Sequence, residues 1–599
     1  MRFSPLFAAQ SLVMSALAAG HEFAPLTQQP TAPLAILTVN ALPSSGALIR
    51  GPYLNQSSDT GIVVRWRSSE TVVGRVCYGD SPTNLTQVTD ELAAATDHQV
   101  ALVGLAPYTR YYYSIGSAGD TLATGADETF RTSPVPGSAA DTRIWVVGDS
   151  GRGTAAQLAS RDAYSNWTGS RTPDLCLMLG DNAYYSGTDA EYQANFFDIY
   201  ASIFPKMPLW STIGNHDAKD KIAATVGGTV SNFATFPYYD IFTFPTAGEC
   251  GGVPSGSERY FSFDYGNIHI INLDSQTSDR RVSEVSGADG AMATWLRADL
   301  ASATQTWILA MFHHPVYSKG SNDSDTVQQM VQMRSNFAPL LEAGGVDLVL
   351  CGHSHAYERS VLMGGHYGLS STFTAAMAKN AGNGRTASLG GVAPGGAYLK
   401  PLRGPRDHFG TVYIVAGSAG AANGGPLNHP VMAVSLNTVG TFNLDIQGDT
   451  LVGTYVQADG TATDRFTLHK KGDADRDSDG IPDAYEDANG LNRASNSDGS
   501  SADLDGDGVI NFNEYILGTA ANVRDQYSWT TTRNPTTGAV TVSFTTLIGR
   551  TYQILCSADL LSWENGSSLM TGDGSVMSWM DPGDAPKRFY RLAVCIGKW

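Results

Sequence analysis

The feature that most constrains the fold is a series of short apolar runs that each end in a polar cluster. Between residues 142 and 355, the runs "RIWVV", "DLCLML", "LWSTI", "WILAMF" and "VDLVLC" are each followed within two residues by Asp, Asn or His. Near-continuous apolar runs of this length are typical of strands buried on both faces. Longer helix-like segments separate them, so the pattern predicts an α/β domain over residues 140–470 whose polar clusters gather beyond the strand ends.

Shorter strand patterns flank this domain. Residues 48–134 alternate apolar and polar side chains, as in "GIVVRWRSS", and the linker "TSPVPGSAAD" follows them. The stretch "LAPYTRY" in this region resembles the E–F corner and following strand of fibronectin type III domains, which implies an N-terminal β-sandwich. Residues 525–599 return to short strand patterns and are expected to form a small all-β module.

The N-terminal residues fit a secretory signal over positions 1–19. Arg2 precedes an apolar stretch that ends in Ala16-Leu17-Ala18, an A-x-A cleavage pattern, although a short buried helix is the alternative. The pattern predicts a secreted protein, extracellular or periplasmic. The rest of the sequence contains no run of 18 apolar residues, so no membrane span is expected. The net charge of -19, with no basic block, argues against a nucleic-acid-binding domain.

The six cysteines are too scattered for a disulfide framework. Cys176 and Cys351 lie inside apolar runs and are expected to be core thiols. Cys556 with Cys595 is the one pair considered for a disulfide.

The polar clusters at the strand ends together offer a set of metal ligands. Each cluster alone is more simply explained as a turn, but the five occur in order and supply only oxygen and nitrogen donors, which suit iron, manganese or zinc. Seven donors exceed the needs of one tetrahedral ion, so the set predicts two ions with one bridging carboxylate. The five clusters are residues 148–151, 180–184, 214–217, 313–315 and 352–355.

With these motifs, residues 48–470 resemble the purple acid phosphatases of the metallophosphoesterase superfamily. The resemblance implies a β-sandwich flanked by helices (αββα) and assigns the ligands. A first ion would bind Asp149, Tyr184 and His355. Asp181 would bridge, and His216 would lie near the substrate. A second ion would bind Asn215, His313 and His353.

The Tyr184 phenolate implies Fe(III) at the first position, beside a second divalent ion, which would be Zn, Fe or Mn. The resemblance implies an acid phosphatase that hydrolyses small phosphomonoesters by in-line attack of a metal-bound hydroxide, with His216 assisting the leaving group and without a phosphoenzyme. A phosphodiesterase or nucleotidase on the same centre is one alternative, and an inactive calcium-stabilised surface or adhesion protein is another.

The sequence departs from the family pattern at one position. Asn322, nine residues beyond His313, stands where plant-type relatives carry a histidine. Asparagine donates a hydrogen bond but no proton, so acid catalysis would depend more on His216.

Residues 472–520 contain two calcium-loop patterns, with oxygen donors at loop positions 1, 3, 5, 9 and 12, glycine at position 6 and a backbone carbonyl at position 7. The proline in the first loop makes the pair resemble dockerin or thrombospondin type 3 repeats. A solvated acidic linker is the alternative. The expected ligands are Asp475, Asp477, Asp479, Ile481, Asp483, Glu486, Asp503, Asp505, Asp507, Val509, Asn511 and Glu514. The module after them is a candidate for cell-surface or carbohydrate contact.

Overall fold

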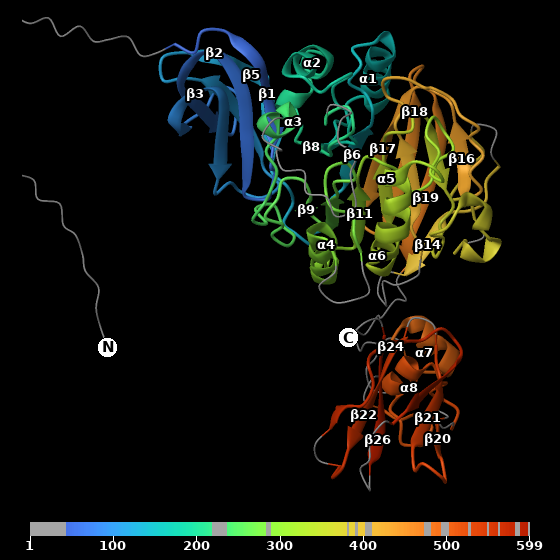
Figure 1. Cartoon of the computed structure of the whole chain (residues 1–599). Coiled ribbons are helices and arrows are strands. Elements are labelled where there is room, and N and C mark those ends of the chain that lie inside the picture. Colours follow the sequence, from blue (N-terminus) through green and yellow to red (C-terminus); the bar gives the residue numbers. More distant parts are fainter. Residues whose placement is uncertain are drawn as a thin grey trace, which may run out of the picture. The chain divides into compact units, whose positions relative to one another are not determined.

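Figure 1 shows the computed structural model of the chain. The described residues are 44–218, 236–282, 289–379, 382–389, 393–401, 410–471, 481–492, 502–524, 529–547, 550–560, 563–581 and 588–596. The expected signal at positions 1–19 lies outside them, as do Asp475, Asp477 and Asp479 of the first calcium loop. None of the described helices is long and apolar enough to cross a membrane.

The N-terminal part is a five-stranded antiparallel unit. The long strand β2 (Gly61–Gly79) pairs with β3 along most of its length. The first half of β2 also pairs with β1, and its second half pairs with β4. The five strands therefore form one hydrogen-bonded sheet and not two separate sheets. The Ala106 amide donates to the Tyr111 hydroxyl at 2.9 Å, which ties the start of the fourth strand to the segment before it. The strands are β1 (Leu48–Asn55), β2 (Gly61–Gly79), β3 (Gln87–Val103), β4 (Arg110–Gly116) and β5 (Thr121–Arg131).

The central part contains two seven-stranded sheets. The first has the order β14-β19-β18-β17-β6-β7-β8, and β6, β7 and β8 run parallel to one another. Its strands are β6 (Thr142–Val147), β7 (Leu175–Met178), β8 (Leu209–Ser211), β14 (Tyr398–Pro401), β17 (Gly440–Gln447), β18 (Thr450–Gln457) and β19 (Ala462–Lys471).

The second sheet has the order β16-β13-β15-β12-β11-β10-β9, with β10, β11, β12 and β15 parallel. Its strands are β9 (Phe261–Tyr265), β10 (Ile268–Asn272), β11 (Trp307–Met311), β12 (Leu348–Cys351), β13 (Tyr357–Ser360), β15 (Val412–Ala416) and β16 (Met432–Leu436).

The near-continuous apolar runs arise because the strands are covered on both faces. In β11, Trp307 and Leu309 belong to a core that also holds residues of the other sheet, whereas Ile308 and Ala310 belong to a second core with residues of α4 (Ala291–Ser302) and α6 (Ala338–Ala343). α1 (Ala155–Thr168) packs against β17 and β18 of the first sheet. The layers are therefore helices, sheet, sheet and helices (Figure 1).

Short helical segments complete the central part. They are α2 (Asp189–Tyr192), η1 (Gln193–Phe197), η2 (Phe204–Lys206), α3 (Pro237–Ile241), α5 (Gln328–Gln332), η4 (Met333–Phe337), η5 (Ser370–Thr372) and η6 (Ala375–Met377).

The C-terminal residues form two short helices and then strands. The helices are α7 (Asp483–Asn489) and α8 (Asn511–Leu517), and the sheets have the orders β20-β21-β25 and β23-β22-β24, with β26 on β22. These strands are β20 (Trp529–Arg533), β21 (Val540–Thr545), β22 (Arg550–Ser557), β23 (Glu564–Asn565), β24 (Met570–Thr571), β25 (Val576–Met580) and β26 (Phe589–Ile596).

The disulfide considered between Cys556 and Cys595 is wrong. The backbone register of β22 and β26 places Cys595 opposite Thr551 and Cys556 opposite Tyr590. The two cysteines are thus five positions apart along the ladder, about 17 Å at the usual rise of a strand. A disulfide needs α-carbons within about 7 Å.

A buried histidine in β10 gives the central part a pH-dependent stability. His269 lies between two carboxylates, with Nδ1 2.7 Å from Asp264 Oδ1 and Nε2 2.9 Å from Asp299 Oδ2. Burial alone would lower its pKa, but the bonds to Asp264 and Asp299 raise it to about 9. The stabilisation is therefore complete below the unfolded value of about 6.5 and is lost as the pH rises through 9.

We expect the free energy of unfolding to fall by about 3 kcal/mol between pH 6.5 and 9.5 for this reason. The measurement is urea-induced unfolding at several pH values, for the wild type and for His269→Gln. The variant should be less stable at pH 6.5 and should lose most of this slope. An equal slope in both proteins would exclude His269 as its source.

Candidate metal centre

The expected metal ligands all lie just beyond the C-terminal ends of parallel strands. Asp149 follows β6, Asp181 follows β7 and Asn215 follows β8 in the first sheet, while His313 follows β11 and His353 follows β12 in the second. The chain turns sharply at these points, because Asp149, Asp181 and His353 have φ values of 56°, 54° and 65°. L-residues adopt this left-handed region at a cost, and such strain is concentrated at functional sites.

One group of ligands surrounds the Tyr184 hydroxyl. Its oxygen lies 3.2 Å from Asp149 Oδ1, 3.0 Å from Asp181 Oδ2 and 3.1 Å from His355 Nε2. The His355 nitrogen is 3.4 Å from Asp149 Oδ1. This group contains the three ligands expected at the first ion, Asp149, Tyr184 and His355. It also contains Asp181, the carboxylate expected to bridge the two ions.

The second group surrounds the side-chain oxygen of Asn215. His313 Nε2 is 3.0 Å and His353 Nδ1 is 2.9 Å from Asn215 Oδ1, and the two histidine nitrogens are 3.3 Å apart. Asp181 belongs to both groups, because its other oxygen, Oδ1, lies 3.5 Å from His313 Nε2. The structure thus brings the seven residues into two sets that share one carboxylate.

The hydrogen bonding of His313 tests whether a cation fits this site. Its Nδ1 lies 2.8 Å from the carbonyl oxygen of Leu179, which can only accept, so Nδ1 carries a proton and a neutral ring has a lone pair at Nε2. That lone pair would face the oxygens of Asn215 and Asp181, which are also acceptors. A cation among the three satisfies all of them, and a backbone carbonyl behind the ring is the usual partner of a metal-binding histidine. Burial lowers the pKa of His313, but the Asp181 and Asp149 charges raise it above its usual value, so in the metal-free protein a proton on Nε2 is favoured in place of a cation.

The charges of the site also favour a cation. Burial, together with the nearby Asp149 carboxylate, raises the pKa of Asp181. Burial and the charges of the same two carboxylates raise the pKa of the Tyr184 phenol well above its usual range. In the metal-free protein, the Tyr184 hydroxyl therefore keeps its proton and can donate it to either Asp149 or Asp181.

His216 lies beside the two groups. Its Nε2 is 4.0 Å from Asp181 Oδ2, and its Nδ1 is 2.9 Å from the Tyr185 carbonyl oxygen, which fixes the ring orientation. Its ring centre is 4.3 Å from that of Tyr184. The predicted position near the substrate is compatible with this geometry.

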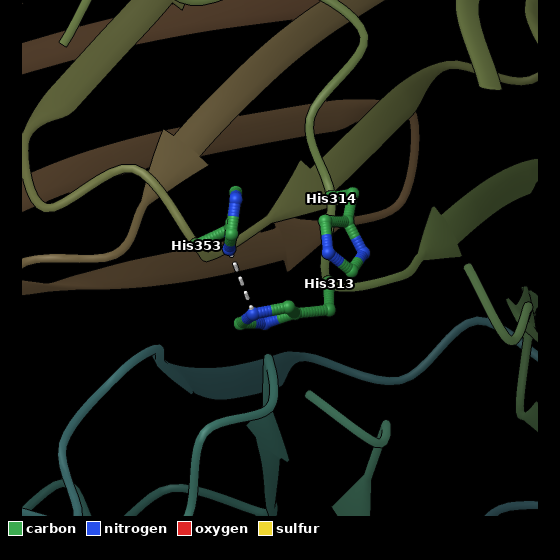
Figure 2. Close-up of side chains that lie close together, drawn as sticks. All are labelled: His313, His314 and His353. Atoms are coloured by element: carbon green, nitrogen blue, oxygen red, sulfur yellow. Dashed lines mark hydrogen bonds between the residues drawn. The ribbon is translucent and has the colours of Figure 1, made fainter. Parts of the chain in front are cut away.

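His314 packs against the second group (Figure 2). Its Nδ1 lies 2.9 Å from the Ser275 hydroxyl, and its ring centre is 4.4 Å from that of His353. Burial lowers the pKa of His314 well below its usual range, so the ring is neutral. It offers a nitrogen within 4.8 Å of ligand nitrogens from His313 and His353.

Sequence reasoning missed two neighbours of His355. Asn423 Nδ2 lies 2.6 Å and Arg152 Nη2 lies 3.5 Å from His355 Nδ1, and the Arg152 guanidinium is 4.2 Å from the centre of the Tyr184 ring. Arg152 sits next to the first motif, which was a weak signal, whereas Asn423 lies in a Gly-rich loop with none. Asn322, at the position of a family histidine, donates from Nδ2 to the His353 carbonyl at 3.0 Å.

Two histidines that follow the last motif in the sequence are enclosed in the protein interior. His366 and His429 are buried, with ring centres 6.3 Å apart, and both pack against Tyr317. His408 lies outside the described residues.

Three acidic side chains of the second predicted calcium loop lie close together. Asp503, Asp505 and Asp507 each offer an oxygen within 4.8 Å of the others. Gly506 and Gly508 have φ values of 72° and 99°, which allow the sharp turn. Asn511 and Glu514 lie in α8, and Val509 in the turn before it.

The structure describes the first predicted calcium loop only from Ile481 onward. Asp483 and Glu486 of this loop lie in α7. The two halves pack together, with the rings of Tyr485 and Tyr515 5.3 Å apart.

Family models match the first two parts of the chain. A model described as "Calcineurin-like phosphoesterase" matches residues 142–357, and one described as "Purple acid Phosphatase, N-terminal domain" matches residues 51–132. The first match contains all seven expected metal ligands.

Two curated relatives from a plant are similar to part of the chain. Purple acid phosphatase 15 of Arabidopsis thaliana is 30% identical over 281 residues, and purple acid phosphatase 23 of the same plant is 28% identical over 278 residues. Each alignment covers 44% of this chain, and the chain spans 49% and 57% of these relatives, about half of their length.

Solved structures share the fold. A purple acid phosphatase from yellow lupin (Lupinus luteus) seeds superimposes with a TM-score of 0.54 at 18% identity, over 71% of this chain and 75% of that one. The structure of PhoD gives a TM-score of 0.50 at 13% identity, over 72% of this chain and 92% of that one. The chain therefore joins a segment that matches the model of the purple acid phosphatase N-terminal domain to a segment that matches the calcineurin-like phosphoesterase model.

Proposed function

We propose that the protein is a two-metal phosphatase that hydrolyses small phosphomonoesters. The observation that carries the proposal is the position of Asp181, whose two carboxylate oxygens face different groups of ligands, 3.0 Å from the Tyr184 hydroxyl and 3.5 Å from His313 Nε2. A shared carboxylate is the feature that distinguishes a paired site from two separate ones.

In this proposal, Asp149, Tyr184 and His355 hold one ion, and Asn215, His313 and His353 hold the other. A phenolate is a hard anionic donor, which favours Fe(III) at the first position, and the mixed nitrogen and oxygen donors of the second suit Zn, Fe or Mn. Two bound cations supply an acidified water and charge stabilisation for phosphoryl transfer to water.

In this proposal, His216 supplies the proton to the leaving group. When the ester is hydrolysed, the bond between phosphorus and the leaving oxygen breaks, and that oxygen needs a proton. Because Nδ1 of His216 is held by the Tyr185 carbonyl oxygen, Nε2 is directed toward the centre and is the atom that would hold the proton for the departing oxygen.

The second carboxylate of the centre, Asp149, is held in place by a backbone hydrogen bond. The His353 amide donates to Asp149 Oδ2 at 2.8 Å.

The test is a comparison of p-nitrophenyl phosphate with bis-p-nitrophenyl phosphate, using protein loaded with iron and zinc. We expect a higher kcat/KM for the monoester. A strong preference for the diester would favour a phosphodiesterase instead, and no turnover of either ester by the loaded protein would contradict the proposal.

Tyr184→Phe tests the iron at the first position. A phenolate bound to Fe(III) gives a visible charge-transfer absorption, so the iron-loaded wild type should be coloured and the variant colourless. Elemental analysis should find iron in both. A colour that survives the substitution would exclude Tyr184 as the iron ligand.

We further propose that the protein is secreted, from the pattern at positions 1–19, and that the loops around Asp475 and Asp503 bind calcium. The C-terminal module is proposed to contact a cell surface or carbohydrate. Support for calcium comes from the three clustered carboxylates of the second loop.

A further inference from the structure

Tyr185 is an exposed aromatic side chain beside the metal centre. It is 67% exposed, whereas its neighbour Tyr184 is 1% exposed. A large ring at the edge of a polar site offers a flat apolar surface to a ligand. The residues assigned to metal binding and proton transfer leave this ring without a role.

The main chain at Tyr185 is held on both sides. The Tyr185 amide donates to Glu191 Oε1 at 2.6 Å, and the Ser186 amide donates to Glu191 Oε2 at 3.1 Å. The Tyr185 carbonyl oxygen accepts from His216 Nδ1 at 2.9 Å. An anchored backbone fixes the position of the Tyr185 α-carbon beside the centre, which limits the ordering entropy lost when a ligand stacks on the ring.

The element that carries Glu191 is itself anchored. Asp189, in the same helix α2, forms ion pairs with Arg50 at 3.0 Å and with Arg67 at 2.7 Å. Both arginines come from strands of the N-terminal part, β1 and β2. These contacts hold the segment that displays Tyr185.

The ring lies on the His216 side of the centre. Its centre is 6.3 Å from that of His216, with the planes at 75°, and 5.9 Å from that of Tyr184. The Arg152 guanidinium lies over the ring at 5.9 Å from its centre. With a cation on one face and most of the side chain open to solvent, the ring has surface free for a second aromatic group.

We propose that Tyr185 forms a leaving-group subsite that selects phosphomonoesters with an aromatic leaving group over those with an alkyl one. The inference rests on the proposed function, in which His216 Nε2 faces the departing oxygen. A ring bonded to that oxygen passes His216 and meets Tyr185, where it gains an aromatic contact. A glycerol group at the same place buries less apolar surface and gains no aromatic contact.

The test compares kcat/KM for phenyl phosphate and for glycerol 2-phosphate in the wild type, Tyr185→Ala and Tyr185→Phe. In Tyr185→Ala we expect the phenyl-to-glycerol ratio to fall about five- to tenfold, through the phenyl value. Tyr185→Phe keeps the ring and should stay within about twofold of the wild type. Equal melting temperatures establish that the variants are folded.

A binding measurement separates this inference from the proposed function. Calorimetry with phenylphosphonate and methylphosphonate, which are not hydrolysed, should show that Tyr185→Ala weakens only phenylphosphonate, by the same factor. A phenyl-to-methyl affinity ratio that is unchanged in Tyr185→Ala overturns the subsite. Absence of turnover in the wild type would count against the phosphatase alone, because the binding ratio still decides the role of Tyr185.

Discussion

Asp181→Asn is expected to lower kcat/KM for p-nitrophenyl phosphate by at least about 10³-fold, the scale on which loss of one preorganised electrostatic partner affects a transition state. The substitution keeps the shape of the side chain but removes the charge that both ligand groups share. It should also weaken metal binding, so that protein equilibrated with limiting iron and zinc retains fewer ions per chain. Steady-state kinetics at saturating metal and elemental analysis after dialysis measure the two effects.

The same substitution should stabilise the metal-free protein. Without ions, Asp181 is a buried carboxyl group beside Asp149, and both burial and that neighbour raise its pKa, so its ionised form opposes folding at neutral pH. We therefore expect the melting temperature of the metal-free variant to exceed that of the metal-free wild type at pH 7, and the order to reverse when metal is added.

A matched control is Asp162→Asn on helix α1, where the side chain is 59% exposed. It removes the same charge from the protein without touching the centre, and its kcat/KM should stay within about twofold of the wild type. If Asp181→Asn behaved like this control in activity and metal content, the shared-carboxylate geometry would have no functional meaning.

Asp464→Asn is expected to lower the free energy of unfolding by about 3–5 kcal/mol, the usual cost of breaking a buried ion pair. Asp464, in β19, is fully buried, with Oδ2 2.6 Å from Arg359 and Oδ1 2.6 Å from Arg385, and it accepts from the Tyr357 hydroxyl at 2.8 Å. Burial opposes its ionisation, but the Arg359 charge lowers its pKa below the usual range. The substitution leaves two arginines buried with a neutral partner.

The effect should reach the metal centre, because Tyr357 and Arg359 lie in β13, which begins two residues after His355. Urea-induced unfolding measures the stability. Asp445→Asn is the control, since Asp445 pairs with Arg143 from a neighbouring part of the same sheet but is 29% exposed, and it should cost less than about 1 kcal/mol. Equal decreases in the free energy of unfolding of the two variants would show that burial of the Asp464 ion pairs does not add to their effect on stability.

Much of the central fold was predictable because strands that are buried on both faces have near-continuous apolar sequences. Runs such as "WILAM" are apolar throughout, since Leu309 faces the core between the sheets and Ile308 faces the helices. The prediction of a metallophosphoesterase fold is confirmed by the family match and the shared fold, whereas the predicted N-terminal β-sandwich is supported only as a β-rich domain. The order of the strands in the sheets could not be predicted in this way. β6 pairs with β17, which is distant in the sequence, and such pairing depends on tertiary contacts.

The same reasoning explains what was missed at the site. Asp149, Asp181 and His353 each follow the end of a strand by two or three residues, so their positions at the sheet edge follow from the strands. Asn423 reaches His355 from a loop whose path depends on the whole fold. The ion pairs of His269 were hidden for a related reason, because Asp299 belongs to a helix that packs across the strand.

The measurement that tests the account most directly is the transition-metal content of purified, iron- and zinc-loaded protein after removal of loosely bound ions. The account predicts two ions per chain, one of them iron, with fewer retained by Asp181→Asn. A wild-type protein that retains no transition metal, or a single ion that Asp181→Asn holds equally well, would contradict the two-metal centre.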